Sequence, residues 1–448
     1  MVPANREKMV MQQVINRSKL LVFLVLLLGG FVAKEPLLWA LDDEATKRDE
    51  VSLNVEPLRV SALPGSALPN LTVDAAGQAL LSWVEPVPGG KGDRLQIAML
   101  EQNGWSEPLT AAQGKGWFVN WADFPSAAVL DDGTIAVHWL DRISAETYSY
   151  GVKVSISRDR GRTWGDPIIP HRDTSPTEHG FVALRSMGDQ FYLAWLDGRA
   201  MAGNSGKAMT LRATVIEADG NRGTDRLLDD RVCDCCPLDV VVDEKQVLLV
   251  YRDRDFLEVR DISWLKDSDG EISARGLVHE DDWVQEGCPV NGPAIARAAG
   301  SSAVVWFTGA ERVLGKPSPQ GAVLGMLMSD SSVTESSKPQ RLDDGRPIGR
   351  VDLAGLTDGS YVVCWIEREG EGAAVRVRRW IPGKPLGSSH RIAQISSGRS
   401  SGYPRLVAIS KGAVVVAWTA TGVKGGTQVM TVRLPLEVAS TTSEPIGD

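Results

Sequence analysis

Short apolar segments that end in an aromatic residue recur along the chain at a nearly constant interval. The clearest copy is residues 191–199, Phe-Tyr-Leu-Ala-Trp-Leu-Asp-Gly-Arg, where an apolar segment leads into a charged turn. The equivalent aromatic residues are Trp83, Trp139, Trp195, Tyr251, Trp306, Trp365 and Trp418, and the intervals between them are 56, 56, 56, 55, 59 and 53 residues. A fixed period in this range predicts a repeat architecture.

Each repeat contains short segments with the length and composition of β-strands, and helical periodicity is almost absent. Turns such as Asp131-Asp-Gly133 and Met187-Gly-Asp189 separate these segments. Four strands per repeat is the plan of a propeller blade, whereas a β-sandwich domain needs about 100 residues. The seven aromatic segments therefore predict an all-β fold, a seven-bladed β-propeller of four-stranded blades, with a six-bladed ring as the alternative.

The two ends of the repeat region predict how the ring closes. The last unit stops after its third strand, Gln428–Leu434, while an extra segment, Val51–Val60, precedes the first unit. Within it, Glu56-Pro-Leu58 resembles Ser106-Glu-Pro-Leu109, which stands in a fourth-strand position. We expect the N-terminal strand to complete the last blade, because closure removes exposed sheet edges.

The segment before the repeats has the features of an export signal. Four basic residues precede the apolar run Leu20–Ala33, which is short for a membrane-spanning helix. Residues 1–40 are therefore predicted to be a signal peptide, with cleavage after Ala40, or an uncleaved N-terminal anchor. Residues 41–50 are predicted to be a linker, residues 51–438 the propeller and residues 439–448 a disordered tail. The propeller is then periplasmic or extracellular.

Net charge excludes one class of partner. The chain carries a formal charge of −9, and removal of residues 1–40, which carry five basic and two acidic side chains, changes it to −12. No cluster of Lys and Arg occurs in the remainder, so nucleic-acid binding is not expected. Contact with a membrane is expected only through an uncleaved N-terminal segment, and the sequence does not predict an oligomeric state.

The turn after the third strand of the second repeat carries a recognisable motif. It reads Ser157-Arg-Asp-Arg-Gly-Arg-Thr-Trp164 and has the form Ser-x-Asp-x-Gly-x-Thr-Trp. This motif resembles the Asp-box, or bacterial neuraminidase repeat, of the sialidase superfamily. Its role is structural: a carboxylate accepts turn N–H groups, a glycine permits positive φ and a Trp packs between blades. The five positions that define it are Ser157, Asp159, Gly161, Thr163 and Trp164.

The resemblance implies further features, and the sequence departs from two of them. Sialidases carry an Arg-Ile-Pro segment that supplies one of three substrate-binding arginines, and this chain has none. They also have six blades rather than seven. By the resemblance, Arg350 could stand for one arginine of the triad, and Tyr403 for the nucleophilic tyrosine. The Cys233-Asp-Cys-Cys236 segment also resembles a group of exported bacterial propellers without an established activity.

Polar residues flank the inner strands at one predicted face. In a propeller, each inner strand begins at the face where each second strand ends, so residues at both places meet around the channel mouth. A concave mouth with convergent polar groups predicts a binding site. The candidate acid–base or nucleophilic residues are Tyr403, Glu178, Asp123 and Asp352; the candidate ligand-binding residues are Arg350, Arg405, Arg199, Arg252, His179, Asn291 and Asp234. The alternative for the Asp–Arg turns is a structural role in ion pairs and turn caps, and for His179 it is a satisfied buried histidine.

Four of the five cysteines fall at the same rim, and the fifth, Cys364, lies inside an apolar strand. In an exported protein, clustered cysteines favour disulfides. Adjacent cysteines pair with strain, so bonds to Cys233 or across to Cys288 are preferred. The alternative is a thiolate site for Zn or Cu(I), although the spacing differs from Cys-x2-Cys. The cysteines concerned are Cys233, Cys235, Cys236 and Cys288.

Together these features favour a sialidase-like propeller that binds a small molecule or a glycan, with an anionic glycan as one candidate, at a Cys-rich channel mouth. Glycoside hydrolysis of the exo-sialidase type is the main alternative. A metal or redox role of the cysteines is the third. No cofactor is expected.

Overall fold

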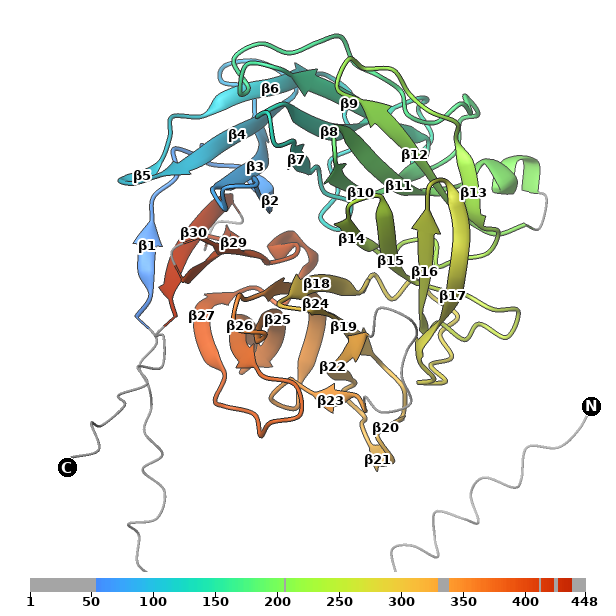
Figure 1. Cartoon of the computed structure of the whole chain (residues 1–448), viewed down its shortest axis with the longest axis vertical. Helices are drawn as coiled ribbons and strands as arrows, with labels where there is room; N and C mark the ends of the chain where they lie inside the picture. The colour runs from blue at the N-terminus through green and yellow to red at the C-terminus, as the bar shows by residue number, and fades with distance from the viewer. Residues whose placement is uncertain (1–53, 205–206, 329–337, 411, 423–425, 437–448) are drawn as a thin grey trace, which may run out of the picture. The chain divides into compact units, whose positions relative to one another are not determined.

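The structure is a computed structural model that describes residues 54–204, 207–328, 338–410, 412–422 and 426–436. These residues form seven blade sheets arranged around a central axis, as Figure 1 shows, together with one small two-stranded sheet. The prediction of a seven-bladed propeller is confirmed, and the six-bladed alternative is excluded. The predicted signal or anchor, linker and tail lie outside the described residues. Within the described ranges, no helix has the length and apolarity needed to cross a membrane.

Each blade is an antiparallel meander that runs from an inner to an outer strand. The first three blades comprise β2 (Ala67–Val73), β3 (Ala79–Pro86), β4 (Asp93–Glu101), β5 (Gly104–Trp105) and β6 (Leu109–Gly114); β7 (Ala127–Val129), β8 (Ile135–Arg142) and β9 (Tyr150–Ser157); and β10 (His179–Met187), β11 (Gln190–Asp197), β12 (Thr210–Glu217) and β13 (Arg226–Asp229). In the second blade the fourth strand is reduced to a single bridge between Val154 and Ile168.

The remaining blades follow the same plan. They comprise β14 (Asp239–Asp243), β15 (Gln246–Arg252), β16 (Ile262–Ser268) and β17 (Glu271–His279); β18 (Ala294–Ala298), β19 (Ser301–Thr308), β22 (Ala322–Met328) and β23 (Gln340–Arg341), with the small hairpin β20 (Arg312–Val313) and β21 (Lys316–Pro317); β24 (Pro347–Gly355), β25 (Tyr361–Glu369), β26 (Gly372–Trp380) and β27 (His390–Ile395); and β28 (Arg405–Ile409), β29 (Ala413–Thr421) and β30 (Thr427–Pro435). Two short 3-10 helices, Arg199–Asn204 and Arg399–Ser401, lie in loops.

The N-terminal strand closes the ring as predicted. Strand β1 (Glu56–Leu58) pairs antiparallel with β30, with Pro57 opposite Val432. The strand is shorter than the predicted segment 51–60. Each inner strand also contacts the next, and β2 contacts both β7 and β28, so the ring has no gap.

The hydrophobic core lies between the blades. It consists of seven clusters of buried side chains, each of which joins one pair of adjacent blades. The aromatic residues of the repeat occupy these clusters, and Trp83, Trp195, Trp306 and Trp365 are completely buried. Burial of an indole requires a partner for its N–H group. In three blades the partner is a carboxylate two residues after the Trp. The indole N–H groups of Trp83, Trp195 and Trp365 donate to Glu85, Asp197 and Glu367 at 2.9, 2.8 and 2.6 Å.

These Trp–carboxylate pairs assign a structural role to several charged turns of the repeat. The carboxylates also accept bonds from backbone N–H groups or arginines at the end of the second strand, as Glu85 does from Leu63 and Arg94. The turns therefore cap the blades, which is the alternative that the sequence left open for the acidic positions.

Candidate functional site

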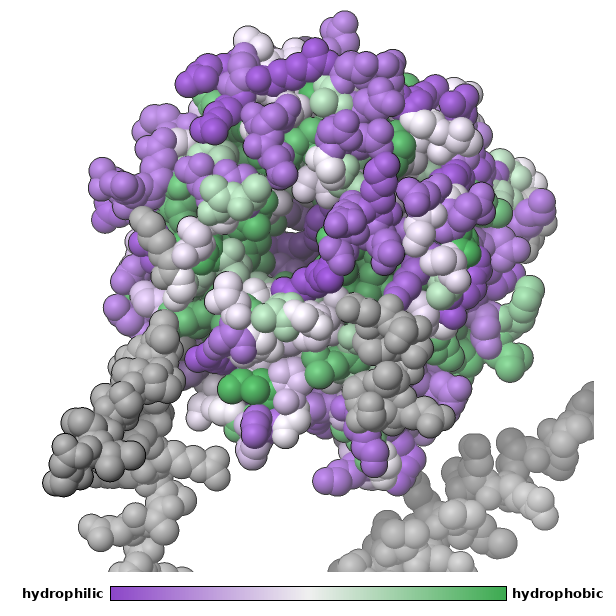
Figure 2. All heavy atoms as spheres, in the orientation of Figure 1, coloured by the Kyte–Doolittle hydropathy of each residue, from purple (hydrophilic) through white to green (hydrophobic). Residues whose placement is uncertain are grey.

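Loops before the inner strands and loops after the second strands meet at one face, called the mouth face here. Gly198, after β11, donates its N–H group to the Glu178 carbonyl at 2.7 Å, and Cys233 donates to the Arg252 carbonyl at 3.0 Å. Figure 2 shows one face of the ring hollowed at its centre, with hydrophilic residues inside the opening and on its right rim and hydrophobic residues on its left rim. The mouth face therefore gathers the two sets of polar residues that the sequence predicted to converge.

Three residues of the mouth face form a hydrogen-bonded acid cluster. Tyr150 is the first residue of β9. Its hydroxyl oxygen lies 3.0 Å from Asp123 Oδ2, and its hydroxyl group donates to Glu178 Oε1. Asp123 Oδ1 accepts the backbone N–H of Phe181 at 2.7 Å. A Cβ on Gly180 would lie 2.1 Å from Asp123 Oδ2, so only glycine at this position permits the cluster.

The cluster must hold a proton in addition to the phenolic one. A tyrosine hydroxyl has a single proton, so it cannot donate to two carboxylates at once. Burial raises the pKa of Asp123 to about 8 and that of Glu178 to about 7. Asp123, which is 1% exposed, is therefore the neutral acid. It donates to the Tyr150 oxygen, and Tyr150 donates to Glu178.

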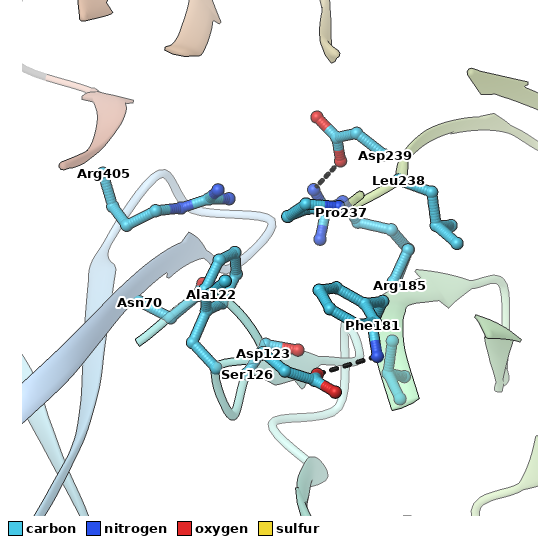
Figure 3. A pocket seen from close by; sticks show the side chains of 13 residues that line it. Asn70, Ala122, Asp123, Ser126, Phe181, Arg185, Pro237, Leu238, Asp239 and Arg405 are labelled. Atoms are coloured by element: carbon cyan, nitrogen blue, oxygen red, sulfur yellow. Dashed lines mark hydrogen bonds and ion pairs between the residues drawn. The ribbon is translucent and has the colours of Figure 1, made fainter. Parts of the chain in front are cut away.

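The cavity beside Asp123 is small. It has a volume of about 20 Å³ and is lined by Asp123, Phe181 and Arg405 together with Arg185 and Asp239, which form an ion pair, as Figure 3 shows. A water molecule needs about 10–15 Å³ on this measure. The channel at this depth has room for about one water, and a sugar ring does not fit.

Trp121, Phe124 and Tyr403 form an aromatic cluster, called the plug, beside this cavity, which Phe124 also lines. The Tyr403 ring stacks on Trp121 at 6.3 Å and lies 5.5 Å from Phe124. Its hydroxyl donates to the Val290 carbonyl at 2.7 Å, and burial raises its pKa above the usual range. The sequence grouped Tyr403 with the candidate carboxylates, but the tyrosine that contacts Asp123 and Glu178 is Tyr150.

Arg350 lies against the plug. Its guanidinium carbon is 4.3 Å from the Trp121 ring centroid, and Nη1 donates to the carbonyls of Gly398 and Gly402 at 3.1 and 3.0 Å. It is 6% exposed, and no carboxylate among the described residues pairs with it. Burial lowers the pKa of its guanidinium. Arg350 is thus a nearly buried cation without a counter-charge.

The remaining arginine and carboxylate candidates of this region form ion pairs. Arg405 Nε lies 3.3 Å from Asp352 Oδ2, which also accepts the N–H of Leu406 at 2.8 Å. Arg199 forms a fork on Asp197 at 2.7 Å and reaches Asp225 at 2.6 Å. These contacts join strands and blades, so Arg199 and Asp352 have structural roles in this geometry.

Four further candidates also have internal partners. Arg252 is 1% exposed and donates to the carbonyls of Asn291, Arg260 and Phe307 at 2.7, 2.5 and 2.6 Å. Asn291 accepts the Arg350 N–H at 2.6 Å, and Asp234 pairs with Arg254 at 3.0 Å. His179 is buried, stacks on His171 at 4.2 Å and contacts Asp173 through Nε2 at 3.1 Å. His179 is therefore a buried histidine whose ring nitrogens both have hydrogen-bond partners, which is the alternative that the sequence left open.

The cysteine cluster is compact. The Sγ atoms of Cys233, Cys235 and Cys236 lie within 4.8 Å of one another, and Cys288 is within hydrogen-bonding reach of Cys235. Burial disfavours a thiolate at Cys233, but hydrogen bonds from Cys235 and Cys236 and the charge of Arg252 outweigh it and hold its pKa well below the usual range. All five cysteines of the chain, including buried Cys364, are free thiols in the structure, so the disulfides stay a prediction.

The Ser157–Trp164 turn has the hydrogen bonds that its motif predicted. Asp159 Oδ1 accepts the Ser157 hydroxyl and the Thr163 N–H, both at 2.8 Å, and Gly161 has φ +86°. The Trp164 ring packs on the core between the first two blades. The turn follows the third strand, away from the mouth face, and no part of the acid cluster contacts it.

Replacement of Asp159 by Asn is expected to lower the melting temperature at pH 7. Hydrogen bonds from Thr163 hold the pKa of Asp159 at about 2, below its usual value of 3.8. Its stabilising effect is therefore complete above pH 3.8 and is lost as the pH falls through about 2. Thermal unfolding followed by circular dichroism should show a difference between the two proteins that narrows with acidification. Equal melting temperatures at pH 7 would contradict the role of this turn.

Two residues of the mouth face escaped the sequence reasoning. Tyr150 begins a third strand, whereas the predicted polar groups stood before inner strands and after second strands. Arg260, 1% exposed, donates to Cys233 Sγ at 3.4 Å. It lies two residues before β16, which is also the start of a third strand, so this position in the repeat was the signal available for both.

Comparison with known proteins identifies the fold alone. No protein-family model and no curated protein sequence matches the chain. Among solved structures, the chain is similar to the BP39L lectin from Burkholderia pseudomallei, at 12% identity and TM-score 0.56 over 84% of this chain and 100% of that one. It is also similar to the polysaccharide lyase Uly1, at 10% identity and TM-score 0.51 over 82% and 90%. A protein of unknown function from Dyadobacter fermentans shares 13% identity, with TM-score 0.50 over 85% and 98%. All three likenesses place this chain among β-propellers.

Proposed function

We propose that the protein is an exported carbohydrate-binding propeller that holds an acidic group of a glycan against Arg350 on the mouth face. The observation that carries this proposal is the missing counter-charge of Arg350. A buried charge is costly unless it is paired. By comparison, Arg94, Arg199 and Arg226 each form an ion pair with Asp or Glu. Arg350 uses only two carbonyls and an aromatic face.

The planar guanidinium suits an acidic ligand. The hydrogen bonds that its side chain makes to the described residues come from Nη1, and the fork of Nε and Nη2 has no partner among them. Such a fork binds a carboxylate or sulfate with two parallel hydrogen bonds. Trp121 is half-buried beneath it and fixes its orientation.

Exposed aromatic side chains around the mouth support a carbohydrate ligand. Tyr148 and Phe256, 63% and 86% exposed, lie in loops that follow second strands and therefore belong to the mouth face. Aromatic rings that are partly in water present an apolar face and, in Tyr, a polar edge, which suits a sugar. The named activities of two similar propellers, a lectin and a polysaccharide lyase, agree with this ligand class. The Asp-box-like turn supports a sialidase-like origin of the propeller.

Binding without hydrolysis fits the geometry better than catalysis. Tyr403 is committed to a backbone carbonyl, and the cavity beside Asp123 holds about one water. One observation favours hydrolysis as the second candidate function: Tyr150, Asp123 and Glu178 form an acid cluster with raised carboxyl pKa values. If sugar is released by the wild-type protein, and this release is lost in Glu178→Gln, hydrolysis replaces the binding proposal.

An array of sialylated, uronate-containing, sulfated and neutral glycans tests the proposal. We expect the wild-type protein to bind acidic glycans, and the variant Arg350→Met to bind them about 10–100-fold more weakly, because a hydrogen bond to a charged group contributes roughly 1.5–3 kcal/mol. The control Arg142→Met removes an exposed guanidinium from the same face and should retain binding. Undiminished binding by Arg350→Met, or binding to neutral glycans alone, would refute the proposal.

A further inference from the structure

The cysteine cluster has a charge environment suited to thiolates rather than to a disulfide. Arg260 directs Nη1 at Cys233 Sγ from 3.4 Å, and both side chains are almost completely buried. A thiolate accepts a hydrogen bond from a cation well, whereas the sulfur of a disulfide accepts it poorly. A disulfide at Cys233 would leave this buried donor unsatisfied, which is costly.

A second buried arginine lies beside the cluster, because the Cys233 N–H donates to the Arg252 carbonyl. Arg252 is bound by three backbone carbonyls and contacts the Trp283 ring, and no carboxylate among the described residues pairs with it. Glu258 compensates Arg260, and Asp234 compensates Arg254. The positive charge of Arg252 therefore lacks a partner unless the neighbouring sulfurs are anionic.

Two adjacent blades hold the sulfurs in place. The Cys233 N–H donates to the Arg252 carbonyl at 3.0 Å, which fixes the loop before β14 against the end of β15. Gly292, in the loop before β18, packs so closely that a Cβ would lie 1.8 Å from the Pro237 carbonyl oxygen. This contact anchors the loop of Cys288 beside Cys236 and Pro237. The cluster is thus held by contacts between loops, and the loop of Cys288 also bonds to Arg350 and Tyr403 through Asn291 and Val290.

We propose that Cys233, Cys235 and Cys236 form a thiolate site for one thiophilic closed-shell metal ion, with Cu(I) preferred and Cys288 as an additional ligand. Metal–sulfur bonds of about 2.3 Å place thiolate sulfurs about 4 Å apart around one ion. The present separations, all within 4.8 Å, therefore need to close by less than about 1 Å. Three gathered sulfurs suit Cu(I), which soft thiolates select. Their spacing lacks the two-residue gap common in tetrahedral zinc sites.

Anaerobic titration of the reduced full chain with Cu(I), against a chromophoric Cu(I) chelator, tests the site. We expect one equivalent of Cu(I) to bind, with a thiolate-to-metal absorption band and a raised melting temperature, since an ion that binds only the folded state stabilises it. Cys235→Ser, at a partly exposed position, should weaken the affinity at least 100-fold. The control Cys364→Ser lies in another blade and should leave the stoichiometry unchanged. A parallel titration with Zn(II) should give weaker binding.

Three results would contradict the proposed Cu(I) site. Absence of stoichiometric Cu(I) binding by the folded, reduced protein would overturn the site. Thiol labelling of the denatured protein purified without reductant would also overturn it if only Cys364 reacted, because the four remaining cysteines would then form disulfides. Tighter binding of Zn(II) than of Cu(I) would contradict the metal preference. None of these results depends on glycan binding, so the two proposals fail separately.

Discussion

Deletion of residues 56–58 is expected to abolish cooperative unfolding. Strand β1 covers the outer edge of β30, and the Leu58 carbonyl accepts the Thr431 hydroxyl at 2.7 Å, which in turn accepts the Trp105 indole N–H at 2.8 Å. This relay joins the first and last blades. Val55, Leu58 and Val60 also pack against the two cores that flank the last blade. Without the strand, the ring opens and β30 presents unpaired backbone groups.

The expected loss is large relative to the stability of the whole domain. The free energy of unfolding of a folded domain is only about 5–15 kcal/mol, so removal of a strand with its core contacts leaves little net stability. Urea unfolding should change from one sharp transition to a broad one, with association at higher protein concentration. The exposed control Arg59→Ala should unfold as the wild-type protein does. A sharp, unshifted transition in the deletion variant would show that the ring is stable without β1.

Replacement of Asp123 by Asn is expected to stabilise the protein at pH 8. The pKa of Asp123 is raised by burial from 3.8 to about 8, so the folded state keeps a proton that the unfolded state loses above pH 3.8. The stability that depends on Asp123 is therefore complete below pH 3.8 and is lost as the pH rises through about 8. Over this window the loss amounts to roughly 5 kcal/mol.

The asparagine imitates the neutral acid. Its carbonyl oxygen can accept the Phe181 N–H, and its amide can donate to the Tyr150 oxygen, as protonated Asp123 does. Urea unfolding at a series of pH values should therefore give a flatter stability profile for Asp123→Asn than for the wild-type protein. Asp159→Asn is a matched control, since the pKa of Asp159 is shifted in the opposite direction and its loss is destabilising. Parallel profiles for wild type and Asp123→Asn would contradict a neutral Asp123.

The fold was predictable because its information is local and repeated. An apolar segment that leads to a Trp or, in one copy, a Tyr recurs near every 56th residue, and each copy signals one blade. Closure was predictable from Glu56-Pro-Leu58, which copies a fourth-strand segment. The strand bounds were not, because β1 is limited to the three residues that meet β30. The outer strand of the second blade also shrinks to one bridge, which turn residues alone did not reveal.

The site was predictable in position but not in its pairings. The order of strands placed Asp123, Glu178, Arg350 and the cysteines at one face. Which arginine meets which acid depends on contacts between blades, such as Arg405 with Asp352, and a repeat period carries no such information. Tyr150 was missed for this reason: its hydroxyl reaches the loops of two neighbouring blades from the start of an ordinary strand.

The central claim is that Arg350 supplies the positive charge for an acidic glycan. Isothermal titration calorimetry tests it most directly with four measurements: wild type and Arg350→Met, each with one acidic oligosaccharide from the array and with its carboxyl-reduced, neutral counterpart. We predict that reduction of the carboxyl group weakens wild-type binding about 10–100-fold and leaves the already weak binding of Arg350→Met unchanged. An equal loss in both proteins, or no loss in the wild type, would contradict the claim.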